Sequence, residues 1–244
     1  MREASEKNAK KIILAIQNDP TDPPHLAGQW LSEIGFEIKT LRADLGEEVP
    51  VTVPENVFAL MPLGGHMGAL DDHIAPWLVN ERALLADAVA KKVPIFAICL
   101  GAQLLAAATG GEVSRAQISE IGIYEITRNQ TSDPIFNFPA GIITAQWHED
   151  QVSKLPPGAV CLASSLACAN QIYRIGSNAY ATQFHPEADA SIIREWETNA
   201  DHAFTQSGKT SVMDEVVEAE AELIQTWKPI VQSWGQLILG NTTK

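Results

Sequence analysis

One cysteine stands where a strand would run directly into a helix. Pro94–Ile98 has no polar side chain, which is typical of a central buried strand, and Cys99–Ala108 has a helical composition that Gly110 and Gly111 end. A side chain at such a junction lies on a tight turn at the carboxyl end of the strand, where open α/β sheets bind ligands. The N-terminal end of the helix carries free N–H groups and a partial positive charge. Both favour the thiolate, which is the attacking form of cysteine.

This junction therefore predicts a nucleophile at Cys99. Gly101 leaves room for the sharp turn, and the N–H of Leu100 is well placed to stabilise an oxyanion. Cysteine is also among the most often buried residue types, so a small packing residue at the end of an apolar strand is the alternative. From the junction alone, both interpretations stay open.

The elements around this junction alternate between strand and helix. Short apolar runs predict strands, and apolar residues at helical spacing predict helices between them. This rhythm indicates a parallel sheet covered on both faces, an α/β fold of three layers. The expected strands are Lys11–Ile16, Phe36–Leu41, Val57–Met61 and Pro94–Ile98, and the expected helices are His25–Ile34, Trp77–Lys92 and Cys99–Ala108.

The pattern changes after Gly111 to shorter candidate strands and then to helices. These strands form either an antiparallel extension or a continuation of the main sheet. Met213–Trp227 has helical spacing, and we expect Pro229 to start or kink a last segment that reaches about Leu239. The candidate strands are Ile121–Thr127, Ile142–Ala145, Val160–Ala163, Gln171–Ile175 and Ala179–Phe184.

Composition limits the partners and the compartment. A net charge of -13 and a pI of about 4.8 disfavour nucleic acids and anionic membrane surfaces as partners. No apolar run approaches the ~20 residues that span a bilayer, and the polar N-terminus does not resemble a signal peptide. The three cysteines do not suggest a disulfide framework or a metal site. We therefore expect a cytoplasmic protein.

Four segments, which stand in the same order as in the family, resemble the class I glutamine amidotransferases. The family's nucleophile signature is similar to Ile98–Ala106 followed by Thr109–Val113, and its second signature is similar to Thr182–Glu187. Trp147–Val152 and Leu155–Ala159 lie between them, and Leu63–Met67 upstream resembles the oxyanion loop of the branch typified by the glutaminase domain of GMP synthase. The resemblance covers Lys11 to Glu187. It implies a flavodoxin-like, mainly parallel open sheet.

The resemblance also implies catalytic roles for particular residues. Cys99 would be the nucleophile and form a γ-glutamyl thioester, while His185 would serve as general base and acid. Glu187 would orient that imidazole and stabilise its charge. Gly65 and Leu100 would offer backbone N–H groups to the oxyanion.

Substrate binding follows from the same resemblance. Gln103, Trp147 and His148 would hold the α-amino and α-carboxylate groups of glutamine. Two residues depart from the family pattern: Ala97 stands where glycine is usual, and His66 stands where proline is common. Neither departure removes a catalytic group.

The predicted protein is an enzyme that releases ammonia from the glutamine side chain. We expect residues 1–190 to form the amidotransferase domain and residues 191–244 to form a helical extension packed on it. The residues after Glu187 are too few for a synthase, so we expect that a separate synthase subunit could be the partner. No cofactor is expected. A stand-alone γ-glutamyl peptide hydrolase is the alternative within the enzyme class. A catalytically silent binding or regulatory protein is the alternative from another class.

Other chemically active residues are expected to be structural. His25, His73 and His202 stand alone and are predicted to lie on surfaces or helix faces. Asp71, Asp72 and His73 suggest a metal site, but no further ligands stand at suitable spacing, so we expect no metal. An aspartate of this stretch is predicted instead to cap the helix that follows. Cys161 and Cys168 are predicted to be packing residues.

Overall fold

The computed structural model describes residues 11–129, 132–199 and 202–240. In this part of the chain, nine strands form one sheet in the order β2-β1-β3-β4-β9-β8-β7-β5-β6. The first five of these are parallel to one another, and the remaining pairings are antiparallel. The strands are β1 (Ile12–Gln17), β2 (Glu37–Arg42), β3 (Val57–Pro62), β4 (Ile95–Ile98), β5 (Glu112–Arg128), β6 (Gly141–Lys154), β7 (Val160–Ser164), β8 (Ile172–Ile175) and β9 (Ala179–Thr182).

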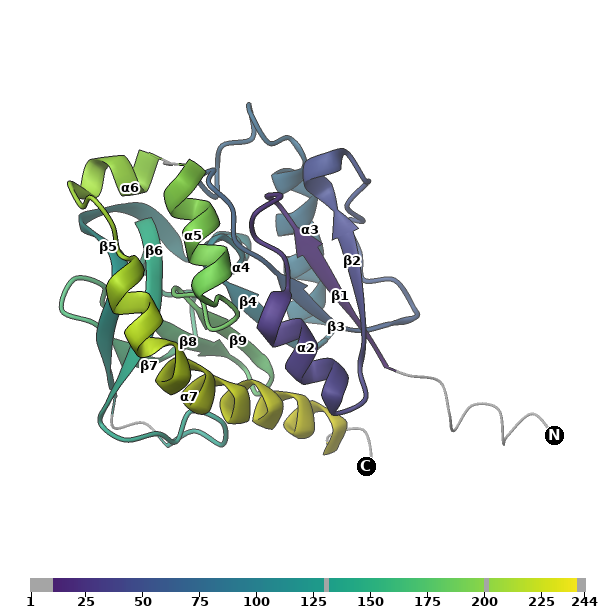
Figure 1. The fold of residues 1–244 in the computed structure, drawn as a ribbon. Coiled ribbons are helices and arrows are strands. Elements are labelled where there is room, and N and C mark those ends of the chain that lie inside the picture. The colour runs from purple at the N-terminus through teal and green to yellow at the C-terminus, as the bar shows by residue number, and fades with distance from the viewer. Residues whose placement is uncertain (1–10, 130–131, 200–201, 241–244) are drawn as a thin grey trace.

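Helices cover both faces of the sheet, which confirms the three-layer α/β fold. In Figure 1, α2, α5 and α7 lie in front of the sheet and α3 lies behind it. The buried side chains form two clusters accordingly, one shared by the sheet with α2, α5 and α7 and the other shared with α3 and α4. The helices are α2 (His25–Glu33), α3 (Trp77–Ala90), α4 (Leu100–Ala108), α5 (Ala190–Asn199), α6 (His202–Ser207) and α7 (Met213–Gly240), with a short 3-10 helix η1 (Ala43–Leu45).

The strand order reverses direction between β1 and β3, because β2 follows β1 in the chain but lies on its far side. Open α/β sheets bind ligands beyond the carboxyl ends of their strands at such a reversal. The ends of β1, β3, β4 and β9 lie at this edge. The segments that follow them contain Asp22, Gly65, Cys99 and His185.

Three local predictions differ from the structure. β5 and β6 are much longer than Ile121–Thr127 and Ile142–Ala145, because their outer halves alternate with polar residues and form a ribbon with register shifts. α7 continues through Pro229 as one helix. The carbonyl of Gln225, which loses its usual donor there, belongs to an exposed residue. No aspartate caps α3, since its N-cap residue is Pro76 and no side chain caps it.

None of the described helices combines the length and the apolar character needed to cross a bilayer.

Candidate active site

Cys99 occupies a strained turn between β4 and α4. Its φ of 51° and ψ of -109° are rare for a residue with a side chain and cost on the order of 1–3 kcal/mol. Hydrogen bonds from the Cys99 N–H to the Thr182 oxygen, at 2.8 Å, and from the Gly101 N–H to the Leu63 oxygen, at 3.0 Å, hold the turn. A Cβ at Gly101 would lie 2.2 Å from the Pro62 oxygen, so only glycine fits. The predicted junction is therefore present, and it projects the sulfur from the edge of the sheet.

His185 lies beside this sulfur. It follows β9, lines a cavity together with Cys99, and donates from Nδ1 to Oε1 of Glu187 at 2.7 Å. All three side chains are buried. Burial lowers the pKa of His185, but the charges of Cys99 and Glu187, together with the hydrogen bond to Glu187, raise it well above its usual value. The arrangement therefore favours the charged imidazolium.

Contacts with α2 hold the segment that carries Glu187. The Leu26 N–H donates to the backbone carbonyl oxygen of Glu187 at 3.3 Å, and Nε2 of His25 lies 2.7 Å from the Asp189 carboxylate. His25 therefore lies on a helix face as expected, but the prediction that it stands alone is wrong. Its partner lies 164 residues away in the chain, and no local pattern reveals such a pair. His73 is exposed as expected, and the side chain of His202 lies outside the described residues.

Two backbone N–H groups close to Cys99 are predicted to bind an oxyanion, those of Gly65 and Leu100. Across the described residues, neither the Gly65 N–H nor the Leu100 N–H donates to a carbonyl or a side chain. Gly65 packs so tightly that a Cβ there would lie 2.7 Å from the Met67 sulfur. Asn18 steadies this loop, since it donates to the Leu63 oxygen and accepts from Nε1 of Trp77 at 2.9 Å. The N–H groups of Gly65 and Leu100 therefore remain available to an acceptor on a ligand.

A cavity of about 510 Å³ opens on one side of Cys99 and contains all three residues predicted to bind substrate. Gln103 donates to the backbone carbonyl oxygen of Asp150 at 3.1 Å and to the Gln183 side chain at 3.3 Å. Gln183 in turn lies 3.8 Å from the Cys99 sulfur, and the Trp147 carbonyl oxygen lies 3.9 Å from it. The lining residues are Gly65, His66, Met67, Gly68, Asp71, Cys99, Gln103, Arg115, Trp147, His148, Glu149 and Asp150.

His148 joins this cavity to the β5–β6 ribbon. Its Nδ1 lies 2.9 Å from the Asp150 oxygen, and its Nε2 lies 3.3 Å from the Glu120 carboxylate, which faces it across the two strands. The Nε2–carboxylate pair is close enough for an ion pair, but its geometry is not that of a hydrogen bond. Glu120 also accepts from Gln171 at 2.7 Å. His148 is thus fixed in the wall of the cavity.

A smaller cavity of about 220 Å³ opens on the other side of Cys99. It shares Gly65, His66, Cys99 and Trp147 with the large cavity, and His185 lines only the smaller one. Further lining residues come from the loop after β1 and from α5: Asp19, Thr21, Asp22, Trp196 and Asn199.

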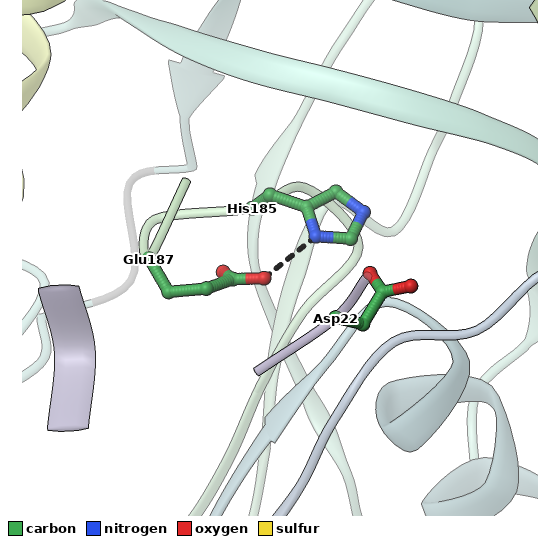
Figure 2. A group of neighbouring side chains, drawn as sticks. All are labelled: Asp22, His185 and Glu187. Carbon is green, nitrogen blue, oxygen red and sulfur yellow. Dashed lines mark hydrogen bonds and ion pairs between the residues drawn. The ribbon is translucent and has the colours of Figure 1, made fainter. Parts of the chain in front are cut away.

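Asp22 is a site residue that the sequence analysis missed. Its carboxyl group is 7% exposed, and it lies beside the His185 ring on a different side from Glu187 (Figure 2). Ligand atoms of Asp22, His185 and Glu187 lie within 4.8 Å of one another, a spacing that could also hold a metal ion. The available signal was its position in the polar stretch that directly follows the first buried strand, at the ligand-binding edge.

The other suspected metal ligands have structural partners. Oδ2 of Asp71 accepts from the Gly68 N–H at 2.8 Å, and Asp72 pairs with Arg82 at 2.7 Å. His66, which stands where proline is common in the family, pairs with Asp19. Burial raises the pKa of Asp19, but hydrogen bonds from His66 and Thr21 outweigh it and lower that pKa. Ala97 is fully buried in the core behind α4.

Comparison with known proteins places these features in a family. The model for glutamine amidotransferase class-I matches residues 31–195. One subunit of the glutamine-hydrolysing GMP synthase from Pyrococcus furiosus is 38% identical over 165 residues, which cover 66% of this chain and 85% of the relative. The corresponding subunit of Methanocaldococcus jannaschii is 38% identical over 113 residues, 46% of this chain and 60% of the relative.

A second kind of relative is a peptidase. Gamma-glutamyl peptidase 3 of Arabidopsis thaliana is 31% identical over 130 residues, so the match spans about half of each protein, 50% of this chain and 51% of the relative. Among solved structures, a glutamine amido transferase from Methylobacillus flagellatus superposes with a TM-score of 0.80 at 27% identity, covering 93% of this chain and 95% of that one.

Proposed function

The chain belongs to the class I glutamine amidotransferase family, and from this premise we propose that it hydrolyses the side-chain amide of glutamine to glutamate and ammonia. Cys99, His185 and Glu187 carry out the reaction, and Gly65 and Leu100 stabilise its oxyanion. The γ-glutamyl group of the substrate occupies the large cavity, against Gln103, Trp147 and His148.

The reaction proceeds in two stages. The Cys99 thiolate attacks the γ-carbonyl carbon, and the charge that develops on the oxygen meets the N–H groups of Gly65 and Leu100, worth roughly 3 kcal/mol each. His185 gives its proton to the nitrogen, the C–N bond breaks, and ammonia leaves a γ-glutamyl thioester. Water then attacks the thioester while His185 accepts its proton. The C–S bond breaks, glutamate leaves, and the thiolate–imidazolium pair is restored.

One arrangement carries this proposal: Cys99, His185 and Glu187 are buried together, His185 donates to Glu187 at 2.7 Å, and His185 lines a cavity together with Cys99. The strained backbone of Cys99 adds support, because such strain is retained where a side chain must project in a fixed direction.

Cysteine variants test the assignment. Cys99→Ser should abolish the release of glutamate and ammonia from glutamine, measured separately on purified protein. Cys161→Ser and Cys168→Ser are the matched controls and should retain nearly full activity. Burial raises the pKa of Cys161, and it raises the pKa of Cys168 to about 12, so neither thiol is suited to attack. Full activity in Cys99→Ser, or equal loss in all three variants, would refute the proposal.

Hydrolysis of γ-glutamyl peptides is the second candidate function, and the volume of the cavity beside His185, though not its charge, suits it. A leaving group larger than ammonia has space there, and the same three residues would cleave the bond. Parallel assays with glutamine and several γ-glutamyl peptides separate the two activities.

Transfer of the ammonia to a separate synthase subunit is part of the proposal. The Pyrococcus furiosus relative is named as one subunit of such an enzyme. Inactivity with every substrate would instead support either a missing partner subunit or the catalytically silent binding protein.

A further inference from the structure

The two cavities that meet at Cys99 differ in their relation to His185. Gln103, His148 and Asp150 line only the large cavity, whereas His185 and Asp22 line only the small one. In an acyl transfer, the leaving nitrogen must lie within hydrogen-bond reach of the group that protonates it. If the acyl group fills the large cavity, the leaving amine must therefore point into the small one.

The small cavity is larger than ammonia requires. A molecule the size of water or ammonia takes up about 30 Å³ in a liquid, and the cavity measures about 220 Å³. The indole rings of Trp147 and Trp196 provide apolar wall beside the polar groups. The space suits an amine with a short carbon chain.

Asp22 supplies carboxyl oxygens to which no group in the described part of the chain donates. It is more than nine-tenths buried and lines the small cavity. A buried acceptor without a donor is costly, and a donor on a ligand removes that cost. Figure 2 shows the carboxyl group beside the imidazole ring, away from Glu187.

The charges in this cavity select among leaving groups. Its lining carboxyl groups are those of Asp19 and Asp22, and the described lining includes no lysine or arginine. Its two histidines already pair with carboxylates, His66 with Asp19 and His185 with Glu187. A leaving group with its own carboxylate would meet repulsion, whereas a leaving group with a second ammonium would meet Asp22.

We infer that the small cavity is a leaving-group site in which Asp22 binds the departing amine, so that the preferred substrates are γ-glutamyl amides of short aliphatic amines and diamines. This inference rests on the proposed function, and it extends that function from ammonia to larger amines. His185 gives its proton to the amide nitrogen, the C–N bond breaks, and the free amine leaves through this cavity. Asp22 is a specificity residue in this scheme.

The protonation of Asp22 agrees with this role. Burial raises its pKa to about 7, with His185 opposing the shift and Asp19 reinforcing it. An ammonium bound next to it would favour the ionised carboxylate, so the amine and Asp22 would stabilise each other's charged forms.

The test compares four substrates that share the γ-glutamyl group: glutamine, the ethylamide, the mono-amide of 1,4-diaminobutane, and γ-glutamylglycine. Glutamate release from each is measured with the unmodified chain, with Asp22→Asn, and with Asp214→Asn, an exposed aspartate at the start of α7, as the matched control. We expect the diaminobutane amide to exceed γ-glutamylglycine at least tenfold in kcat/KM. Asp22→Asn should reduce that ratio about tenfold, and Asp214→Asn should leave it unchanged.

The possible outcomes separate the two levels of the proposal. If γ-glutamylglycine is cleaved as well as the diaminobutane amide, the inference fails while the proposed function stands. A fall of equal size for all four substrates in Asp22→Asn would assign Asp22 a structural role and would also overturn the inference. If the unmodified chain releases glutamate from none of the four, the proposed function fails, and the leaving-group site fails with it.

Discussion

The imidazole of His185 has acidic groups on several sides. Glu187 accepts from Nδ1, the Cys99 side chain lines the same cavity as the ring, and Asp22 lies beside it. Because Cys99 and Glu187 raise the pKa of His185 well above its usual value, the charged ring is favoured, and a cation beside a thiol activates it for attack. The catalytic sulfur would therefore be reactive before any substrate binds.

Alkylation of the sulfur measures this directly. In His185→Asn the thiolate loses its cationic partner, so we expect the rate at which iodoacetamide modifies Cys99 at pH 7 to fall at least tenfold. The modified residue is identified by mass spectrometry. His73→Asn replaces an exposed histidine and should react at the rate of the unmodified chain. An unchanged rate in His185→Asn would show that the imidazole does not activate the sulfur.

Local sequence predicted the elements in which neighbours along the chain are also neighbours in space. The apolar strand before Cys99 and the helix after it follow from one continuous segment. Asp22 could not be assigned this way, because its contact with His185 joins the end of β1 to the end of β9 across the sheet. The β5–β6 ribbon was underestimated for a related reason. Its polar outer half pairs through backbone hydrogen bonds, and the pattern of side chains does not predict these.

Helix α3 carries a buried acid that the sequence analysis did not single out. Glu81 is fully buried, accepts a weak hydrogen bond from Asn18, and has no donor in the described chain for Oε2. Burial raises its pKa to about 8, opposed by the Asn18 hydrogen bond. Asn18 also binds the loop that contains Gly65, so Glu81 supports the proposed oxyanion site from behind.

Replacing Glu81 with glutamine should remove a loss of folding stability that grows as the pH rises. Below about pH 4.5, Glu81 is protonated in the folded and unfolded chains alike. As pH rises toward 8, the unfolded chain loses the proton first, so the free energy of unfolding falls, by up to roughly 4 kcal/mol. Glu81→Gln should therefore be more stable than the unmodified chain at pH 8 and similar to it at pH 4.5, as measured by urea unfolding. Glu48→Gln, at an exposed position, should show no such difference, and an equal gain at both pH values would contradict the mechanism.

At the scale of the whole molecule, α7 covers one face of the sheet together with α2 and α5. Trp234 is fully buried with its ring 5.4 Å from that of Phe96 in β4, and Nε1 of Trp227 donates to the Ile143 oxygen at 3.2 Å. Gly235 packs so closely on α2 that a Cβ there would lie 2.5 Å from Ile34. These contacts support the proposal that residues 191–244 form a helical extension of the domain made by residues 1–190 and share its core.

One pair of glycine variants tests whether the two parts unfold together. Gly235→Leu inserts a side chain between α7 and α2 and should cost about 1–3 kcal/mol, lowering the midpoint of thermal unfolding by several degrees. Gly240→Leu, at a position where an added Cβ meets nothing within 4 Å, should leave the midpoint nearly unchanged. The transition is followed by circular dichroism and by the rate at which a thiol reagent modifies Cys168. This cysteine is buried and lies between β7 and β8, in the antiparallel half of the sheet, so it becomes reactive when that half unfolds. Because the two parts share one core, both signals should shift together in Gly235→Leu. A helical signal lost at lower temperature, with Cys168 still protected, would instead mean that α7 detaches from a sheet that is stable without it.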